Sequence, residues 1–519
     1  MFSKASITLS LLLPLLSKTQ AAFFYPDVQT SLLEHLIVDT YGAYWSGFSF
    51  AITPCSHYVS GNQTLGRETA AQWLRVAFHD FVTARVEEGT GGMDASLGFE
   101  TLREEDSGTA FNDSLTFFRP FVNSKVSMAD LIAISVSISV GNCGGPQIAA
   151  RGGRIDATEA GQFGVPAPET DLETTLGYFA NAGFNRVDSI ALTACGHTLG
   201  SVHHGGFPTV VGPEAVSATN TAGGIHFDST VDLFDPSVVN EYLDGTGNQG
   251  GPLVTSFNAS SRSDLRLYES DSNATMVTLA NQGAGFLNTC KGLLQRMVEV
   301  VPKNVKLSDV ISPLQVKPVN ATLDFDDSGN LVFKGYIRIL SSTSSAPSVL
   351  TLTTSTSPKP LVLIPESAPG SSVFGVTHFF PFSTPIKPAS SFQSFTINGK
   401  SLAPHTFPVE ASAFVIPSLS SVKSGASTTV DFTVATLSSK GVFKRSALKP
   451  SVSVSAPVPQ MGTLGPAILG FKDVAVTNVG EKMGYLLWRG SVDVGVLATG
   501  NVTVEVISGG VAVDTLLLG

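Results

Sequence analysis

The chain has 519 residues, of which 43% are hydrophobic and only 14% charged. This length predicts roughly two to four domains, with ample apolar material for a large core. The composition excludes disorder as the dominant state, since disordered chains are charged and poor in apolar residues. The formal net charge of −11 argues against a nucleic-acid partner, because nucleic acids bind to basic surfaces.

The N-terminus has the pattern of a secretory signal peptide. Lys4 precedes an apolar run over residues 7–16, and the segment ends in the small residues Ala21 and Ala22. The run is too short to span a bilayer, and no later segment supplies about twenty uninterrupted apolar residues. We therefore expect residues 1–21 to be a signal peptide, and the protein to be secreted, extracellular and without a membrane span.

Two further features agree with secretion. Six N-glycosylation sequons begin at Asn62, Asn112, Asn258, Asn273, Asn320 and Asn501. The four cysteines are too few for a disulfide-dense scaffold, but an oxidising compartment allows two bridges.

The chain divides into two halves with different sequence patterns. Residues 22–304 are typical of helices, with helix-capping patterns at Ser127 and Asn185. Beyond residue 305, apolar residues alternate with a period of two, and along 331–339 Lys334 and Arg338 point away from the apolar strand face. We predict a mainly α domain over 22–304 and an all-β, sandwich-like region over 305–519. The second region has room for two modules, divided near residue 405.

Arg75 and His79 lie four residues apart in a segment with a helical pattern. They therefore project from one helix face, with Phe78 beside them. A neutral imidazole can take the proton of a peroxide and return it to the leaving oxygen, while a guanidinium stabilises charge on that oxygen. His197 also lies on an apolar helix face. Taken singly, each histidine is more often a core or surface residue, so neither decides the chemistry alone.

Six segments occur in the order in which a known family carries them: LRVAFHDF, GGMDAS, VSMADLIAIS, NCGGP, VPAPE and TACGHTLG. Together they resemble the plant-type haem peroxidase superfamily, specifically its secreted fungal branch. The resemblance covers about residues 45–300 and leaves the β-rich region unexplained. It implies a mainly α haem-peroxidase domain, haem b, hydrogen peroxide as one substrate, and small reductants such as phenols as the other.

On the proximal side, the resemblance implies three roles. His197 matches the histidine that binds the haem iron, and Asp264 matches the buried carboxylate that accepts its N–H. Phe227 matches the aromatic residue that packs by the proximal imidazole. The cytochrome-partnered or intracellular type carries a tryptophan beside one of the two histidines, so Phe227 and Phe78 argue against that type.

On the distal side, His79 matches the acid–base residue and Arg75 its charge-stabilising partner. Asp106 matches the position where the family normally places an asparagine that orients the distal histidine, although a one-residue shift would change this match. A carboxylate there favours the imidazolium, so we expect it to raise the pKa of His79.

The same matching implies two calcium sites, built from carboxylate, hydroxyl and carbonyl oxygens. The distal set is Asp80, Gly92, Asp94 and Ser96. The proximal set is Thr198, Asp228, Thr230, Leu233 through its carbonyl, and Asp235. Asp and Ser in glycine-rich loops also cap turns. We favour calcium because both sets adjoin the haem histidines.

The chain also departs from the family. It has fewer cysteines than secreted fungal relatives usually carry. The resemblance favours Cys55–Cys143 first and Cys195–Cys290 second, although three pairings are possible and the sequence does not choose among them.

Two specialised substrate sites of the family have no match in this chain. Manganese-oxidising relatives use three carboxylates, whereas the matching positions here are Glu68, Gln72 and His203. Relatives that oxidise bulky aromatics use an exposed tryptophan, where this chain has Leu192. Trp73 lies on an apolar helix face, where core packing is the more frequent role. We therefore expect oxidation of low-potential phenols and dyes at the haem edge.

Two functions, from different classes of protein, are compatible with the sequence. The first is a secreted haem peroxidase. The second is an extracellular wall-associated or adhesive protein, whose β region binds a cell-wall or lignocellulose polymer and whose peroxidase half is inactive. An intact set of iron ligand, acid–base residue and arginine favours the enzyme, since inactive relatives usually lose one of these. For the β region, polymer binding and a packing role are equally compatible with the sequence.

Overall fold

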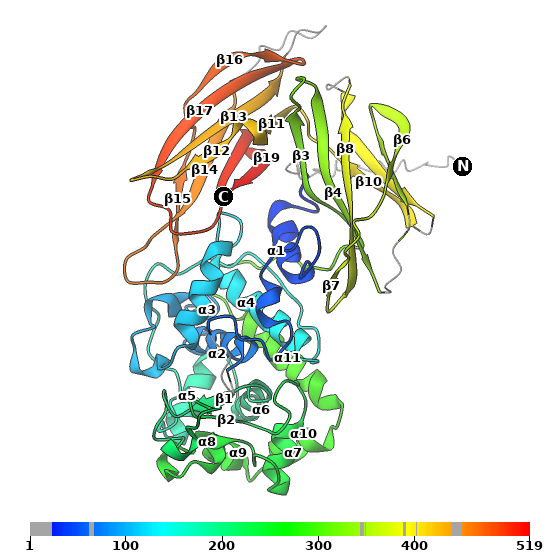
Figure 1. Cartoon of the computed structure of the whole chain (residues 1–519). Coiled ribbons are helices and arrows are strands. Elements are labelled where there is room, and N and C mark those ends of the chain that lie inside the picture. The colour runs from blue at the N-terminus through cyan, green and yellow to red at the C-terminus, as the bar shows by residue number, and fades with distance from the viewer. Residues whose placement is uncertain are drawn as a thin grey trace, which may run out of the picture.

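The computed structural model describes residues 23–61, 67–342, 347, 349–387, 391–400, 402–438 and 449–519. These residues form a helical region and a β region that lie end to end, with helix α1 at the boundary (Figure 1). Helices followed by antiparallel sheets confirm the predicted fold class. The predicted signal peptide and the sequon at Asn62 lie outside the described residues.

The helical region is built from short helices joined by capped turns. The helices are α1 (Val28–Val38), α2 (Thr69–Val82), α3 (Ala110–Phe118), α4 (Met128–Asn142), α5 (Leu172–Asn181), α6 (Arg186–Gly196), α7 (Ser237–Asp244), α8 (Pro252–Thr255), α9 (Ser263–Tyr268), α10 (Ala274–Asn281) and α11 (Gly285–Glu299). Ser127 caps α4 by accepting the backbone N–H of Asp130. Asn185 and Asp188 form a reciprocal capping box at α6. In the described part of the chain, no helix is both long enough and apolar enough to cross a membrane.

One apolar core holds the helices together. Helix α4 is buried from Met128 to Val140, and α2 packs against it. Two disulfides, Cys55–Cys143 and Cys195–Cys290, add covalent links, the second between α6 and α11. Both pairings are those that the resemblance favoured. Such links stabilise the fold largely by restricting the unfolded chain.

The β region begins with two antiparallel sheets, whose strand orders are β3–β4–β8–β7 and β10–β9–β5–β6. The strands are β3 (Val316–Phe325), β4 (Leu331–Ser341), β5 (Leu350–Thr354), β6 (Ser357–Leu363), β7 (Gly370–Ser372), β8 (Gly375–Pro385), β9 (Ser394–Gly399) and β10 (Leu402–Pro408). Phe333 and Phe380 of the first sheet share one core with Phe395 of the second. Alternating residues of β4, such as Leu331 and Phe333, belong to this core.

Two more sheets follow, with orders β11–β13–β17–β16, to which β12 adds by pairing with β13, and β15–β14–β18–β19. The strands are β11 (Ala413–Val415), β12 (Ser421–Lys423), β13 (Thr428–Leu437), β14 (Ser451–Val458), β15 (Ala467–Phe471), β16 (Val476–Lys482), β17 (Tyr485–Gly495), β18 (Val502–Ser508) and β19 (Val511–Leu518). Their common core is rich in valine, with Val430 and Val434 in the same cluster as Val502 and Val504. Gly509 and Gly510 have positive φ, as the tight turn between β18 and β19 requires.

Helix α1 is held against the β region by a buried ion cluster. Arg338 of β4 donates to Glu34 at 2.6 Å and to Asp39 at 3.1 Å, and Lys317 of β3 donates to Glu34 at 2.6 Å. Burial alone would raise the pKa of Glu34, but the charges of Lys317 and Arg338 outweigh it and lower that pKa. The polar face of β4 is therefore covered by α1 at Arg338, whereas Lys334 on the same face is half-exposed.

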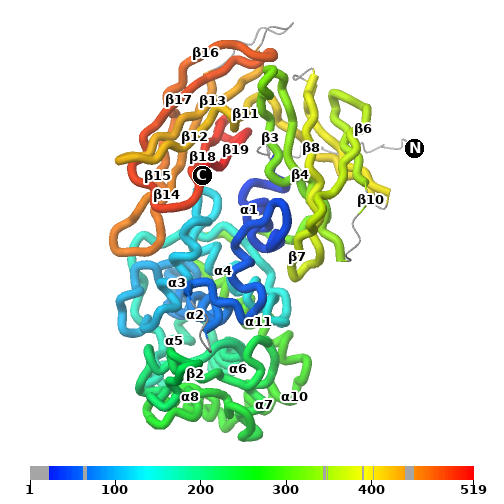
Figure 2. The backbone as a smooth tube through the Cα atoms, in the orientation of Figure 1, coloured from blue at the N-terminus to red at the C-terminus, as the bar shows by residue number. Residues whose placement is uncertain are grey.

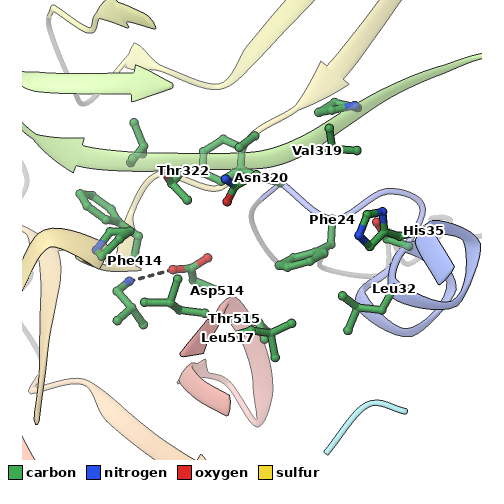
Figure 3. A pocket seen from close by; sticks show the side chains of 18 of the residues that line it. Phe24, Leu32, His35, Val319, Asn320, Thr322, Phe414, Asp514, Thr515 and Leu517 are labelled. Atoms are coloured by element: carbon green, nitrogen blue, oxygen red, sulfur yellow. Dashed lines mark hydrogen bonds between the residues drawn. The ribbon is translucent and has the colours of Figure 1, made fainter. Parts of the chain in front are cut away.

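The residues just before α1 belong to the β region's core. Phe23 stacks on Phe333 with ring centroids 5.0 Å apart, and the Tyr25 hydroxyl donates to the carbonyl of Pro408. A cavity of about 110 Å³ lies where α1, β3, β11 and β19 meet. Phe24 and Asp514 approach it from opposite sides (Figure 3). The N-terminal segment is thus shared between the two regions.

The later strands also contact the helical region. Lys125 pairs with Glu505 of β18 at 2.7 Å. The segment between β14 and β15, drawn in orange in Figure 2, reaches the short 3-10 helix η2 (Ser96–Phe99), where the backbone N–H of Leu464 donates to the carbonyl of Gly98. Leu464 packs on the helical core. Both parts of the β region therefore touch the helical region directly.

Candidate active site

Helix α2 presents Arg75 and His79 to the same side, as their spacing predicted. His79 is buried, and its Nδ1 lies 2.7 Å from Oδ1 of Asp106. Arg75 donates to the carbonyl of Ser107 at 2.8 Å, and its guanidinium lies 4.5 Å from the ring centroid of Phe111. The adjacent residues Asp106 and Ser107 therefore hold the imidazole of His79 and the guanidinium of Arg75, respectively.

Burial and a neighbouring cation dominate the electrostatics of His79. Burial and the positive charge of Arg75 hold the pKa of His79 well below its usual value. Burial raises the pKa of Asp106 to about 6, although Arg75 and Arg103 act in the opposite direction. Desolvation and the neighbouring cation therefore dominate the pKa of His79, while the effect of Asp106 on that pKa relative to an asparagine stays a prediction. His79 is consequently neutral at neutral pH.

His197 follows the end of α6, where it serves as the C-cap residue. Its Nδ1 lies 2.7 Å from Oδ2 of Asp264 on α9. The ring of Phe227 stacks on the imidazole with centroids 3.9 Å apart and an angle of 4° between the planes. The structure thus brings together the three residues that the sequence proposed for this side, although they are spread over 68 positions of the chain.

The other aromatic candidates take different positions. Phe78 is partly buried and packs against Phe81 and Phe179. Trp73 is fully buried, with its ring 5.0 Å from that of Phe48, which agrees with a packing role. Leu192 is also buried, so this position offers no accessible surface to a substrate.

Comparison with known proteins identifies the helical part. Residues 57–282 match the peroxidase family model. Residues 57–282 are a peroxidase domain. The matched range starts after α1, the helix that the β region holds.

Three curated relatives show how far the similarity extends. The chain is 41% identical over 322 residues to a WSC domain-containing protein of Arthroderma benhamiae, covering 61% of this chain and 43% of the relative. It is 34% identical over 145 residues to the putative L-ascorbate peroxidase 6 of Arabidopsis thaliana, covering 27% of this chain and 44% of the relative. It is 35% identical over 156 residues to peroxidase 36 of the same plant, covering 27% and 43%. The chain spans less than half the length of each of these relatives.

His79 and His197 each leave one ring nitrogen for chemistry. Because Asp106 and Asp264 engage the Nδ1 atoms, the Nε2 atoms of His79 and His197 are the ones available. The side chain of His197 is 26% exposed although the neighbouring Ala194 and Cys195 are fully buried, so the ring borders open space. An imidazole whose N–H is held by a carboxylate is a suitable haem ligand. The donor set therefore fits haem iron.

The distal calcium candidates lie around the loop after α2. Asp80 accepts the backbone N–H groups of Ala95 and Leu97, and Asp94 accepts that of Ser96. Burial and the charge of Asp94 raise the pKa of Asp80 well above its usual value. The Ser96 hydroxyl is buried without a hydrogen-bond partner. Gly92, with φ of +98°, shapes the loop, and its carbonyl accepts the N–H of Asp94. Two crowded carboxylates and an unpartnered hydroxyl suit a hard cation.

Four of the five proximal calcium candidates follow strand β2 (Gly224–His226), and Thr198 follows α6. The Thr230 hydroxyl donates to both Asp228 and Asp235, at 3.1 Å each. Burial raises the pKa of Asp228 to about 7, and Oδ2 of this residue has no hydrogen-bond partner. Thr198 is buried, whereas the side chain of Leu233 is exposed, which leaves only its carbonyl as a ligand. Among the described residues, no group of three or more His, Cys, Asp or Glu side chains is placed to hold a metal, so each set depends on hydroxyl and carbonyl oxygens.

A further polar cluster lies at the start of α2. Glu68 is buried, and its Oε1 lies 3.8 Å from Nδ1 of His226. Burial, reinforced by Asp232, raises the pKa of Glu68 to about 8. Gln72 donates to Asp113, and His203 lies on β1 (Ser201–His203), which pairs with β2 (Gly224–His226). Glu68 and Gln72 lie one turn apart at the start of α2, and the three matched positions together supply one carboxylate.

Sequence reasoning missed two residues near the site. His226 is one residue before Phe227, and no motif marks it. Tyr268 lies four residues after Asp264 on α9 and is fully buried. The four-residue spacing was the one available signal that Tyr268 shares a helix face with Asp264.

Proposed function

We propose that this protein is a secreted, extracellular haem peroxidase that reduces hydrogen peroxide and oxidises small phenolic or dye-like donors. One observation carries the proposal: each of two histidines in a peroxidase domain is oriented by a buried carboxylate. Arg75 lies on the same helix as His79, which completes the group needed to cleave a peroxide bond.

His79 is the acid–base residue in this proposal. Its Nδ1–H donates to Asp106, which leaves Nε2 without a proton. Nε2 takes a proton from hydrogen peroxide and returns it to the leaving oxygen. Arg75, fixed by its bond to the carbonyl of Ser107, stabilises the negative charge on that oxygen. The low pKa of His79 keeps this base neutral over the neutral pH range.

His197 would hold the haem iron through Nε2. Asp264 accepts the Nδ1–H and makes the imidazole a more basic ligand, while Phe227 fixes the ring plane. When bound, haem b would store the two oxidising equivalents that hydrogen peroxide delivers, and donor molecules would then supply electrons one at a time.

Two calcium ions belong to the same proposal. The distal ion would take Asp80, Asp94, Ser96 and the carbonyl of Gly92. The proximal ion would take Thr198, Asp228, Thr230, Asp235 and the carbonyl of Leu233. Support comes from the raised pKa values of Asp80 and Asp228, because a divalent cation relieves the cost of burying crowded carboxylates.

The substrate class follows from the groups near the site. The positions of Glu68, Gln72 and His203 provide one carboxylate, and Mn²⁺ prefers several oxygen ligands with negative charge. Leu192 carries no indole, and the indole of Trp73 is buried, so neither position exposes an indole to a substrate. We therefore propose low-potential phenols and dyes as donors, with little turnover of Mn²⁺ or of non-phenolic aromatics. Efficient saturable turnover of either in steady-state assays would contradict this substrate class.

The extracellular location rests on the two disulfides and on the sequons. The described sequon residues Asn112 and Asn320 are exposed. Binding of a cell-wall or lignocellulose polymer by the β region stays a prediction, which a pull-down on insoluble cellulose, chitin and lignin would test.

The test of the function is an absorption spectrum of the full-length secreted protein. We expect a Soret band that shifts on addition of one equivalent of hydrogen peroxide and returns when a phenol is added. A protein that contains no haem, and that takes up none when haem is added, would contradict the proposal and favour the non-catalytic alternative.

A further inference from the structure

Arg75 is a cation that the nearby carboxylate of Asp106 does not bind. Its guanidinium donates to the neutral carbonyl of Ser107 at 2.8 Å. Asp106 uses Oδ1 for His79, and its Oδ2 has no hydrogen-bond partner. Burial lowers the pKa of Arg75 to about 10, although the charge of Asp106 acts in the opposite direction, so the guanidinium keeps its proton at neutral pH. The positive charge of Arg75 therefore stays available to an anion.

One aromatic ring packs on both distal residues. The guanidinium carbon of Arg75 lies 4.5 Å from the ring centroid of Phe111, which is within the range of a cation–π contact. The imidazole of His79 lies against the same ring, with centroids 4.6 Å apart and an angle of 54° between the planes. The ring of Phe78 is farther from this imidazole, at 6.0 Å. Phe111 therefore contacts the proposed acid–base residue and its cationic partner at once.

Helix α3 holds the ring of Phe111 in place. Phe111, Leu115 and Phe118 recur at helical spacing on α3, and all three are buried. The ring of Phe118 packs against that of Trp73 on α2, with centroids 5.1 Å apart. Because α2 also carries Arg75, this contact joins α3 to the helix that presents the guanidinium. Core packing therefore keeps the Phe111 ring beside the cation.

Two further contacts enclose the guanidinium of Arg75. Gly108 has φ of +103°, and a Cβ added there would lie 3.2 Å from Nη1 of Arg75. The ring centroid of Phe207, in the loop between β1 and β2, lies 5.4 Å from the guanidinium carbon. An arginine side chain has many rotamers, and each such contact reduces the number that it can adopt. Two aromatic rings and a close backbone thus restrict the cation.

We propose that Phe111 and Phe207 are positioning residues, whose rings fix the guanidinium of Arg75 where it stabilises an anion on the distal side. The inference rests on the proposed peroxidase function, in which Arg75 stabilises the leaving oxygen. A carboxylate partner would also fix the arginine, but it would offset the positive charge that the reaction uses. An aromatic face attracts the cation through its quadrupole and leaves the net charge unchanged.

Phe117 provides a matched control on the same helix. Its ring packs on those of Phe48 and Trp73, at 5.8 Å and 5.7 Å, and in the described structure it contacts neither Arg75 nor His79. Phe117→Leu therefore removes the same atoms from α3 as Phe111→Leu does, without touching the guanidinium. A role of Phe111 in packing alone predicts equal effects of the two changes on anion binding at equal stability.

The experiment titrates fluoride into the ferric, haem-loaded, full-length protein and follows the Soret band, without peroxide or donor. Fluoride binds as an anion, so its affinity reports stabilisation by Arg75. We expect Phe111→Leu to weaken fluoride binding about tenfold, Phe207→Leu to weaken it less because its ring is farther away, and Phe117→Leu to leave it unchanged. In the Arg75→Leu background, Phe111→Leu should add no more than about a twofold loss, because the ring acts through the guanidinium.

Stopped-flow reaction of the same variants with hydrogen peroxide separates the possible failures. If Arg75→Leu binds fluoride and reacts with peroxide as the wild type does, the inference and the role of Arg75 in the proposed function both fail. If Arg75→Leu impairs both but Phe111→Leu matches Phe117→Leu, or loses as much affinity in the Arg75→Leu background as alone, the positioning role is overturned and the peroxidase function stands. If melting shows that Phe111→Leu does not fold, Phe207→Leu decides, and an unchanged fluoride affinity there overturns the proposal.

Discussion

The helical region and the β region bury ionisable side chains in different ways. Among the described residues, every buried carboxylate oxygen without a hydrogen-bond partner lies between Glu68 and Asp271, in the helical region. In the β region, by contrast, buried Asp324 receives bonds from Lys334 and Ser418. Unpartnered buried charge is costly, so it persists where a ligand or a reaction uses it. These unbonded carboxylate oxygens agree with a proposed site in the helical region.

The β region contacts helical elements that lie beside the proposed site. Its most deeply buried positive charges, Lys317 and Arg338, neutralise Glu34 of α1 and Asp39 at the end of that helix. Its segment between β14 and β15 rests on η2, which carries the distal calcium candidate Ser96. These contacts favour a packing role for the β region.

The largest expected effect comes from removing the proposed iron ligand. His197→Ala should abolish stable haem binding, because no other histidine of the described chain is paired with Asp264 and stacked on Phe227. A matched change in the other region, His405→Ala on β10, should leave haem content unchanged. Haem content after purification measures both. Full haem occupancy in His197→Ala would assign the iron to another residue.

The ion cluster at α1 tests the packing role of the β region. Arg338→Met removes one partner of two buried carboxylates, and breaking such buried pairs costs about 3–5 kcal/mol. Lys423→Met breaks the exposed pair with Asp431 and should cost no more than about 1 kcal/mol. Urea unfolding of the full chain compares the two variants. Equal stabilities would mean that the cluster contributes no more than a surface ion pair.

Calcium removal should destabilise the helical region more than the β region. If free calcium exceeds the dissociation constant about a hundredfold, each bound ion stabilises the fold by about 2.7 kcal/mol. Differential scanning calorimetry with EDTA, and again after calcium is restored, measures the shift. An unchanged thermal midpoint, with no calcium found by metal analysis, would contradict both proposed calcium sites.

The smallest expected effect concerns the pH dependence. The carboxylate of Asp106 accepts the Nδ1–H of His79, but protonated Asp106 can donate to Nδ1 and so place the imidazole proton on Nε2. Because the pKa of Asp106 is about 6, reaction with peroxide should slow as the pH falls through 6. Asp106→Asn always accepts from Nδ1–H, so it should react about tenfold faster than the wild type at pH 5. Identical pH profiles would exclude this role for Asp106.

Features that depend on local pattern were predictable from the sequence. The alternating runs of β13 and β18 and the capping box at Asn185 are set by residues a few positions apart. The spacing of Arg75 and His79 similarly fixes their common helix face. The functional roles of these residues came from resemblance to a family, because no local pattern specifies a reaction.

Features that depend on tertiary packing were not predictable. The partners Glu34 and Arg338 are 304 positions apart, and nothing in either segment marks the other. The pKa of His79 depends on how deeply the chain buries it beside Arg75. The contact between Tyr268 and Tyr242 joins two helices whose crossing the sequence does not encode locally.

The proposed function depends above all on His79 as the base that activates hydrogen peroxide. Stopped-flow measurement of the Soret change tests it most directly, by comparing wild type with His79→Leu at equal haem content. We predict that His79→Leu keeps its haem and reacts with peroxide at least about a hundredfold more slowly, which is the lower range for general acid–base catalysis. A variant that reacts at the wild-type rate would contradict the assignment of the distal site.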